Sequence, residues 1–342
     1  MLVPFFAPKV GYDSKDIAAI VGLFTGVLVT LAGAFFGQQI NPSGGLAINQ
    51  IKRKKIMAAF IPQFAHDTVL KLAEAGYLPT INPATDLPAG YVVVGQITAN
   101  LQVAAQLAAN APAQHQQLLT SLAASGAGLG WVVQSVTDGI AVAAFRGTQS
   151  VDDWLHNLDF ILAPYQPVPS SGMVHAGFQL YYLTIRNSLL SLLSRLPQTC
   201  NRLILTGHSL GAALSELAAP DVLHNFNGRW LPEVQNFAGP RVGQNDFVNV
   251  FDAQIDVCFR VANIWDVVPN IPPPLIFEHV GMAVTIDGGF TLNELQAHSL
   301  QQSYGPGLLK LVPAAAAAPM GILAVTAVTA AFPQVPLIGR VP

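Results

Sequence analysis

The feature that most constrains this chain is a serine held between two glycines at a predicted strand-to-helix junction. The pentapeptide Gly-His-Ser-Leu-Gly, residues 207–211, follows a short β-prone run at 203–206 and precedes a helical run at 212–219. A strand, a sharp turn and a helix in this order raise a serine hydroxyl above the end of a sheet. The flanking glycines remove side chains that would collide with neighbouring turns. Ser209 is therefore the predicted nucleophile.

Strands and helices alternate through most of the predicted chain. Residues 131–136 and 140–145 alternate like strands and are joined through Asp138-Gly139, which is a strong hairpin signal. From there strands and helices alternate up to Val268, as expected of a mostly parallel sheet. A further strand is predicted at 91–97, and helices are predicted at 57–76 and 104–124. Together with the serine turn, this order predicts the α/β-hydrolase fold.

The predicted chain has three parts. They are an apolar, helical N-terminal extension with a basic cluster at 1–56, the α/β-hydrolase domain at 57–312 and an apolar Ala/Val/Pro-rich tail at 313–342. Within the tail, residues 314–332 are apolar but are broken by Pro319 and Gly321. A second membrane-seeking segment and a low-complexity extension both stay open for this tail.

A membrane contact is expected from the N-terminal extension. Residues 17–37 carry no charged side chain, and a helix of that length can cross a hydrocarbon layer. A membrane or interfacial helix, a helix packed on the catalytic domain and a cleaved signal peptide all stay open. The basic side chains at 52–55 would remain cytoplasmic or contact anionic headgroups. A secreted and a membrane-associated location both remain possible for the chain.

Charged residues are scarce, at 10% against roughly a quarter in ordinary soluble domains. Some apolar surface must therefore meet lipid, substrate or a partner. Residues 61–313 contain nine basic and seventeen acidic residues, which argues against a nucleic-acid partner. Cys200 and Cys258 have neither metal-site spacing nor partners for a disulfide framework, so we expect two buried thiols.

A serine hydroxyl becomes a good nucleophile only when a base takes its proton and a carboxylate holds that base. In this fold the acid and then the histidine follow the serine along the chain. Asp266 is the best-placed acid because it follows the β-prone run 257–262 and begins a proline-terminated turn. Only His279 and His298 come later, and the pattern alone favours neither strongly. His208 lies inside the turn at a position where many residue types are tolerated.

Several separated motifs resemble the class 3 lipase family, the fungal-type triacylglycerol lipases and their relatives. The resemblance runs from about Tyr91 to Tyr304, with the motifs in the family's order. These motifs are AFRGTQSVDDWLHNLDF at 144–160, VHAGF at 174–178, LTGHSLGAAL at 205–214, FAGPRVGQNDF at 237–247 and NIWDVVPNIPPP at 263–274.

The resemblance implies a role for the acid and a choice between the two histidines. Asp266 matches the acid of the family's catalytic triad. The family often has a histidine that is not the base soon after the proline-rich turn, which corresponds here to His279. Its base lies further on and close to an aromatic residue, so His298 with Tyr304 is favoured over His279. In the family this aromatic is usually closer to the base.

The resemblance also implies an oxyanion hole and a lid. Thr148 matches the family's oxyanion-hole residue, and Leu210 offers a second N–H because it follows the nucleophile. Residues 150–158 resemble the lid, a short amphipathic helix that turns outward at a lipid surface. Its apolar side would consist of Val151, Trp154, Leu155 and Leu158. A fixed surface helix stays open as the alternative.

The implied reaction is acyl transfer without a metal or organic cofactor, followed by water releasing the acid. The predicted function is a serine esterase or lipase that hydrolyses triacylglycerol or other acyl esters, so that the expected partner is a lipid or small acyl-ester substrate. Phospholipase A1 and feruloyl-type esterase activities are near alternatives. A membrane-associated, non-catalytic binding protein with a hydrolase fold is the alternative of another class.

Overall fold

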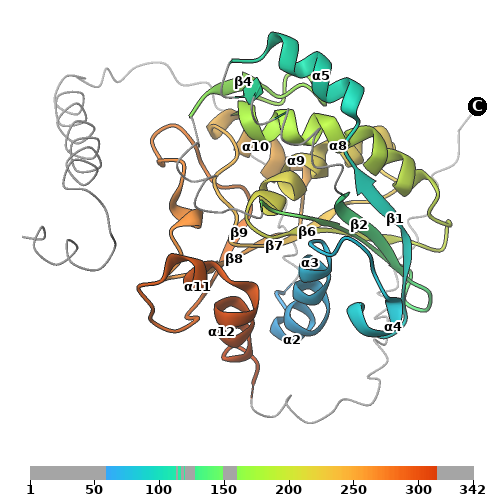
Figure 1. Ribbon diagram of the computed structural model, residues 1–342, viewed down its shortest axis with the longest axis vertical. Helices are drawn as coiled ribbons and strands as arrows, with labels where there is room; N and C mark the ends of the chain where they lie inside the picture. Colours follow the sequence, from blue (N-terminus) through green and yellow to red (C-terminus); the bar gives the residue numbers. More distant parts are fainter. Residues whose placement is uncertain (1–58, 113–114, 117–118, 120–127, 149–159, 314–342) are drawn as a thin grey trace, which may run out of the picture. The chain divides into compact units, whose positions relative to one another are not determined.

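The computed structural model describes residues 59–112, 115–116, 119, 128–148 and 160–313, and a seven-stranded sheet lies at the centre of this part (Figure 1). In sheet order the strands are β1 (Tyr91–Thr98), β2 (Gly128–Ser135), β3 (Ile140–Phe145), β6 (Arg202–Gly207), β7 (Glu233–Phe237), β8 (Cys258–Asn263) and β9 (Met282–Ile286). The strands from β3 to β9 pair in parallel, whereas β1 and β2 extend the sheet antiparallel. The predicted mostly parallel sheet is confirmed. Two short strands, β4 (Leu162–Pro164) and β5 (Met173–His175), form a separate pair.

The predicted hairpin joins β2 to β3. Gln134 pairs with Ala141, and the turn between the strands contains Asp138 and Gly139. The Ser135 hydroxyl donates to Asp138 at 2.8 Å, and Gly139 has a φ of 65°. A left-handed residue in a tight turn favours glycine because no Cβ is strained. The Asp-Gly signal therefore corresponds to a real backbone requirement.

Helices cover both faces of the sheet (Figure 1). The first face carries α5 (Leu101–Asn110), α8 (Ala176–Ser194), α9 (Leu210–Asn225) and α10 (Asn245–Gln254). The second face carries α2 (Pro62–Phe64), a π-helical turn η2 (Ala65–Leu70), α3 (Lys71–Ala75), a second π-helical turn η4 (Leu300–Tyr304) and α12 (Gly305–Leu309). The remaining turns are α4 (Pro83–Asp86), η3 (Val268–Asn270) and α11 (Glu294–His298). The sheet is therefore buried on both sides, as its apolar strands require.

Two predicted helices begin or end elsewhere. The helix predicted at 57–76 begins at Pro62, because the proline ring suits the first turn of a helix. The helix predicted at 104–124 starts earlier, at Leu101, and is interrupted after Asn110, whereas His115, Gln116 and Leu119 are helical again. Ala111 is extended, with φ −86° and ψ 154°, because the residue before Pro112 is pushed out of the helical region.

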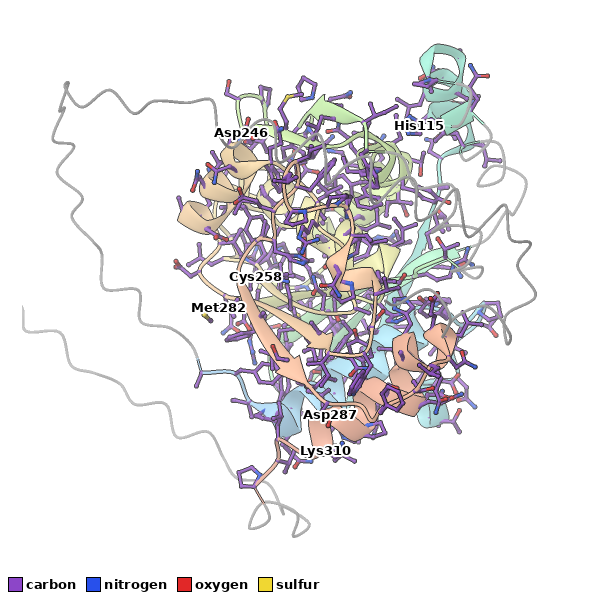
Figure 2. The ribbon with its side chains drawn as sticks, turned by 90° about the vertical axis from the view of Figure 1, so that its left-hand side faces the viewer. His115, Asp246, Cys258, Met282, Asp287 and Lys310 are labelled. Carbon is purple, nitrogen blue, oxygen red and sulfur yellow. The ribbon has the colours of Figure 1, made fainter. Side chains whose placement is uncertain are left out.

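Several predictions concern residues that the structure does not describe. The extension up to residue 56, the predicted lid at 150–158 and the apolar tail segment 314–332 all lie outside the described residues, so the domain boundaries stay predictions. Among the described residues, no helix combines the length and apolar character needed to span a membrane. Both cysteines are buried thiols, as predicted, and Figure 2 labels Cys258 near Met282, at the starts of β8 and β9.

A carboxyl group lies in the core between α9 and the sheet. Glu216 is fully buried, and its Oε1 accepts a hydrogen bond from Asn236 Nδ2 at 2.9 Å. Burial raises the pKa of Glu216 from 4.5 to about 8, although the positive charge of Arg260 opposes the shift. Glu216 is therefore neutral in the folded protein at neutral pH.

We expect Glu216→Gln to protect the fold at alkaline pH. The folded state keeps this proton up to about pH 8, whereas the unfolded chain releases it near 4.5. The free energy of unfolding must fall as the pH rises through that window, by up to about 5 kcal/mol, and glutamine removes this loss. Denaturant unfolding at pH 5 and pH 9 should show the variant gaining on the wild type. The exposed Glu294→Gln is the matched control, and parallel pH profiles for Glu216→Gln and the wild type would contradict the account.

Candidate active site

Ser209 occupies a strained turn between β6 and α9. Its φ of 60° and ψ of −126° are rare for a residue with a side chain, and such strain typically persists at functional sites. A Cβ on Gly207 would collide with the backbone of Gly211, and one on Gly211 would lie 2.9 Å from the carbonyl carbon of Phe145. The Ser209 N–H donates to Phe237 O at 3.1 Å, which ties the turn to the end of β7. Only glycine therefore fits at positions 207 and 211.

The predicted site residues meet at one edge of the sheet. Thr148 follows β3, Ser209 follows β6 and Asp266 follows β8, so all three lie beyond the carboxyl ends of parallel strands. His298 is the last residue of α11, which comes after β9. Because parallel strands end at the same edge, chain segments far apart in sequence are brought together there.

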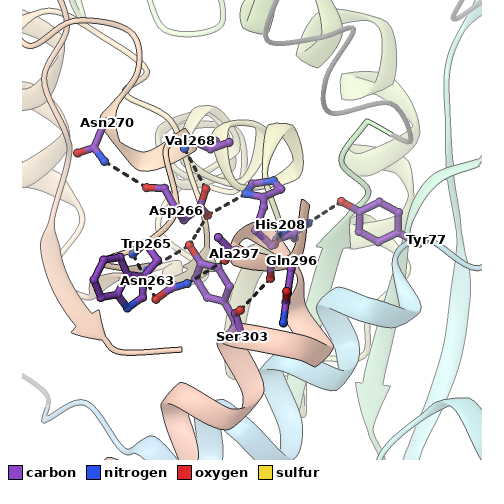
Figure 3. Close-up of polar contacts among 12 residues, drawn as sticks. Tyr77, His208, Asn263, Trp265, Asp266, Val268, Asn270, Gln296, Ala297 and Ser303 are labelled. Carbon is purple, nitrogen blue, oxygen red and sulfur yellow. Dashed lines mark hydrogen bonds and ion pairs between the residues drawn. The ribbon is translucent and has the colours of Figure 1, made fainter. Parts of the chain in front are cut away.

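Asp266 and His298 form a buried pair. His298 Nδ1 lies 2.8 Å from Asp266 Oδ2, and the two side chains are almost fully buried. Asp266 Oδ1 accepts from the Val268 N–H at 2.9 Å, which fixes the plane of the carboxylate (Figure 3). A carboxylate on Nδ1–H holds the imidazole in the tautomer whose Nε2 can accept a proton. The pair therefore has the arrangement that a general base needs.

Three buried side-chain atoms at this edge have no hydrogen-bond partner among the described residues. They are Ser209 Oγ, His298 Nε2 and Thr148 Oγ1. Leu210 is the first residue of α9, and the first N–H groups of a helix have no partner within the helix. Buried polar atoms are rarely left unsatisfied in folded proteins. These groups are therefore available for the roles that the sequence predicts. Ser209 Oγ would be the nucleophile, His298 Nε2 the base, and the groups of Thr148 and Leu210 the donors to an oxyanion.

His279 is placed elsewhere. Its Nε2 lies 2.8 Å from Pro269 O, and burial, reinforced by the positive charge of Arg260, lowers its pKa from 6.5 to about 3. An imidazole that stays neutral under ordinary conditions and is bonded to a backbone carbonyl is suited to a structural role. Of the two histidines that the sequence left open, the structure places His298 on Asp266. Its role as the base stays a prediction.

Two further residues, Tyr304 and Asn263, hold this pair through contacts that were not predicted from the sequence. The Tyr304 hydroxyl donates to Asp266 Oδ2 at 2.6 Å and accepts from the Asn263 N–H at 3.2 Å. Asn263 Nδ2 donates to Ala297 O at 2.9 Å, beside His298 (Figure 3). Tyr304, the aromatic residue that the sequence places after the predicted base, thus contacts the acid. Asn263 could have been singled out in the sequence because it is a polar residue at the end of a buried strand.

Comparison with known proteins agrees with this geometry. Residues 142–276 match the family described as lipase (class 3). Over these residues the chain is similar to the class 3 lipase family. The predicted lid of a class 3 lipase, with Val151, Trp154, Leu155 and Leu158, falls within the matched range but outside the described residues.

Relatives of this chain carry two kinds of name. Phospholipase A1-II 3 of Oryza sativa subsp. japonica is 34% identical over 176 residues, covering 43% of this chain and 42% of that protein. A lipase of Rhizomucor miehei is 33% identical over 142 residues, covering 40% of this chain and 39% of that protein. The chain thus spans about two fifths of the length of these two relatives.

Among solved structures, lipase II from Rhizopus niveus superposes with a TM-score of 0.53 at 22% identity, covering 67% of this chain and 81% of that one. This likeness shows the fold. The predicted α/β-hydrolase fold is confirmed.

Proposed function

We propose that this chain is a serine esterase that cleaves carboxylic esters of lipids through an acyl-enzyme. The observation that carries the proposal is the buried His298–Asp266 pair, 2.8 Å apart, at the sheet edge that also holds the strained Ser209. A nucleophile, a base and an orienting acid are the three groups that acyl transfer requires. The match of residues 142–276 to the class 3 lipase family supports the same reaction class.

The proposed reaction runs through two acyl transfers. Ser209 Oγ attacks the ester carbonyl while His298 Nε2 takes its proton, and Asp266 orients the imidazole throughout. The N–H groups of Thr148 and Leu210 bind the oxyanion that forms on the carbonyl oxygen. His298 then gives the proton to the leaving alcohol. A water, deprotonated by His298 in its turn, releases the acid and restores Ser209.

A lipid substrate is supported by the side chains around the pair. Ile264, Trp265 and Val267, on both sides of Asp266, are 54%, 41% and 40% exposed. Phe290, whose ring centre lies 4.7 Å from that of Trp265, is also exposed. The Trp265 indole N–H donates to Asp287 Oδ1 at 2.9 Å, which holds this ring in place. Lys310 Nζ donates to the backbone oxygen of Asp287 (Figure 2). Exposed apolar groups beside a site mark a surface for apolar ligands. Contact of residues 17–37 with a membrane, and a lid at 150–158, are further parts of this proposal.

Phospholipid is the second candidate substrate. The names of the rice relatives favour it, because they are called phospholipase A1. Both candidates contain an acyl ester that Ser209 would attack, so the two differ only in what the rest of the site accepts.

A substrate panel tests the proposal. The full chain is incubated with p-nitrophenyl butyrate and dodecanoate, a triacylglycerol emulsion and phosphatidylcholine vesicles, and released fatty acid or nitrophenol is measured. We expect hydrolysis of the nitrophenyl esters and of one lipid at least, and the position of the fatty acid released from phosphatidylcholine identifies phospholipase A1 activity. A chain that binds these lipids but hydrolyses none of the esters would be the non-catalytic binding protein instead.

A further inference from the structure

A chain of hydrogen bonds, called the line below, joins three segments of the site. These are the loop before Thr148, the Ser209 turn and the end of α11. The Tyr77 hydroxyl lies 2.8 Å from His208 Nδ1, and the backbone N–H of Gly147 is bonded to the same Tyr77 oxygen. His208 Nε2 lies 2.8 Å from the backbone oxygen of His298. Figure 3 shows Tyr77, which lies in the turn after α3, reaching His208. The line starts next to Thr148, passes the residue before Ser209 and ends on the predicted base.

The direction of every proton in this line follows from its two ends. A backbone carbonyl only accepts, so His208 Nε2 must carry the hydrogen that bonds to His298 O. In a neutral ring Nδ1 is then an acceptor, so the Tyr77 hydroxyl donates to it and its oxygen is left to accept from the Gly147 N–H. Burial and the nearby His298 ring lower the pKa of His208 well below its ordinary value, which keeps it neutral. The ring centres of His208 and His298 are 4.4 Å apart.

The packing around Gly147 shows how closely the loop before Thr148 depends on this line. A Cβ on Gly147 would collide with the Tyr77 hydroxyl, and it would lie 2.6 Å from His208 O and 3.2 Å from Ser209 Cβ. The loop therefore rests directly on the tyrosine and on the serine turn. A shift of Tyr77 or His208 would therefore move this loop, which includes Gly147 and Thr148 and is called the oxyanion loop below, relative to Ser209.

We propose that Tyr77 and His208 are positioning residues that fix the oxyanion loop, the Ser209 turn and His298 relative to one another. This inference rests on the proposed ester hydrolysis. The oxyanion and the protonated His298 exist together only in the tetrahedral intermediate and in the transition states beside it, so a misplacement of the two segments raises the energy of these states without weakening substrate binding. Loss of the line should therefore lower kcat and leave KM nearly unchanged.

Three substitutions separate the two ends of the line. Tyr77→Phe removes one oxygen and leaves both His208 Nδ1 and the Gly147 N–H without a partner. His208→Gln retains a donor near the place of Nε2, facing His298 O, whereas His208→Asn retains only an acceptor near the place of Nδ1. We expect kcat on p-nitrophenyl butyrate to fall about 10- to 100-fold in Tyr77→Phe and about 100-fold in His208→Asn, with KM within about twofold. His208→Gln should recover most of the activity that His208→Asn loses.

A matched control separates positioning from stability. Tyr165→Phe also removes a buried tyrosine hydroxyl, but this one donates to the backbone carbonyl of Leu217 and lies in the core of the other face of the sheet. Its kcat should equal that of the wild type even if its unfolding midpoint falls. The double variant Tyr77→Phe/His208→Asn should be about as slow as its slower parent, because one line is broken twice.

The outcomes distinguish this inference from the proposed function. If the wild type hydrolyses the ester and folded Tyr77→Phe and His208→Asn keep kcat within twofold, the positioning role is wrong while the function stands. A loss that appears in KM alone, or an equal loss in His208→Gln and His208→Asn, also contradicts it. If either His208 variant fails to fold, Tyr77→Phe alone decides, because it removes a single atom. A wild type that hydrolyses no ester overturns both proposals.

Discussion

Ser209→Ala is expected to lower kcat for p-nitrophenyl butyrate by about 10⁵- to 10⁶-fold, the scale seen when the nucleophile of a serine hydrolase is removed. The loss is this large because the remaining groups cannot form an acyl-enzyme, and only oxyanion stabilisation and binding persist. Ser194→Ala is the matched control, since that serine is exposed and its hydroxyl donates to the backbone oxygen of Ser191, within its own helix, at 2.8 Å. Equal rates in Ser209→Ala and the wild type would contradict the account.

Asp266→Asn should cost about 10⁴-fold in kcat with KM little changed. An amide has nearly the shape of the carboxylate, but its NH₂ group faces the Nδ1–H of His298, so the imidazole is driven to the tautomer that cannot act as a base. Both oxygens of Asp266 accept from donors, Oδ1 from the Val268 N–H and Oδ2 from the Tyr304 hydroxyl, so an NH₂ group loses a hydrogen bond in either orientation of the amide. Steady-state rates from pH 6 to 9 measure the loss.

The control for this substitution is Asp256→Asn, in an exposed position outside the site. It should leave both kinetic constants unchanged. A fall of less than tenfold in folded Asp266→Asn would mean that His298 is not held by Asp266 during the reaction.

The sequence indicated the parts of the site that depend on local geometry. Ser209 was predictable because the glycines at 207 and 211 are needed for steric reasons that act within a few residues. Asp266 was predictable because a buried strand and a proline-rich turn place it at the sheet edge. The choice between His279 and His298 depended on packing, so residue pattern alone left it open and only the family resemblance favoured His298.

The parts that could not be predicted depend on contacts between distant segments. Tyr77 and His208 are 131 positions apart, and nothing near either residue indicates that their side chains meet. His208 was assigned to a tolerant position within the turn, whereas its ring is buried and bonded to the backbone of His298. The helix boundaries at Pro62 and Ala111 differ from the predicted ones for another reason: a proline sets each boundary locally, and apolar periodicity does not reveal that effect.

The central claim is that Ser209 forms a covalent acyl-enzyme with the help of His298. It is tested most directly by incubating the full chain with a p-nitrophenyl alkylphosphonate, which is attacked as an ester is but is not released, and locating the adduct by mass spectrometry. We predict one phosphonyl group per chain on the peptide containing Ser209, formed with release of one nitrophenol, and a rate that falls by orders of magnitude in His298→Ala. An adduct on another residue, or labelling of Ser209 at the same rate without the imidazole, would contradict the account.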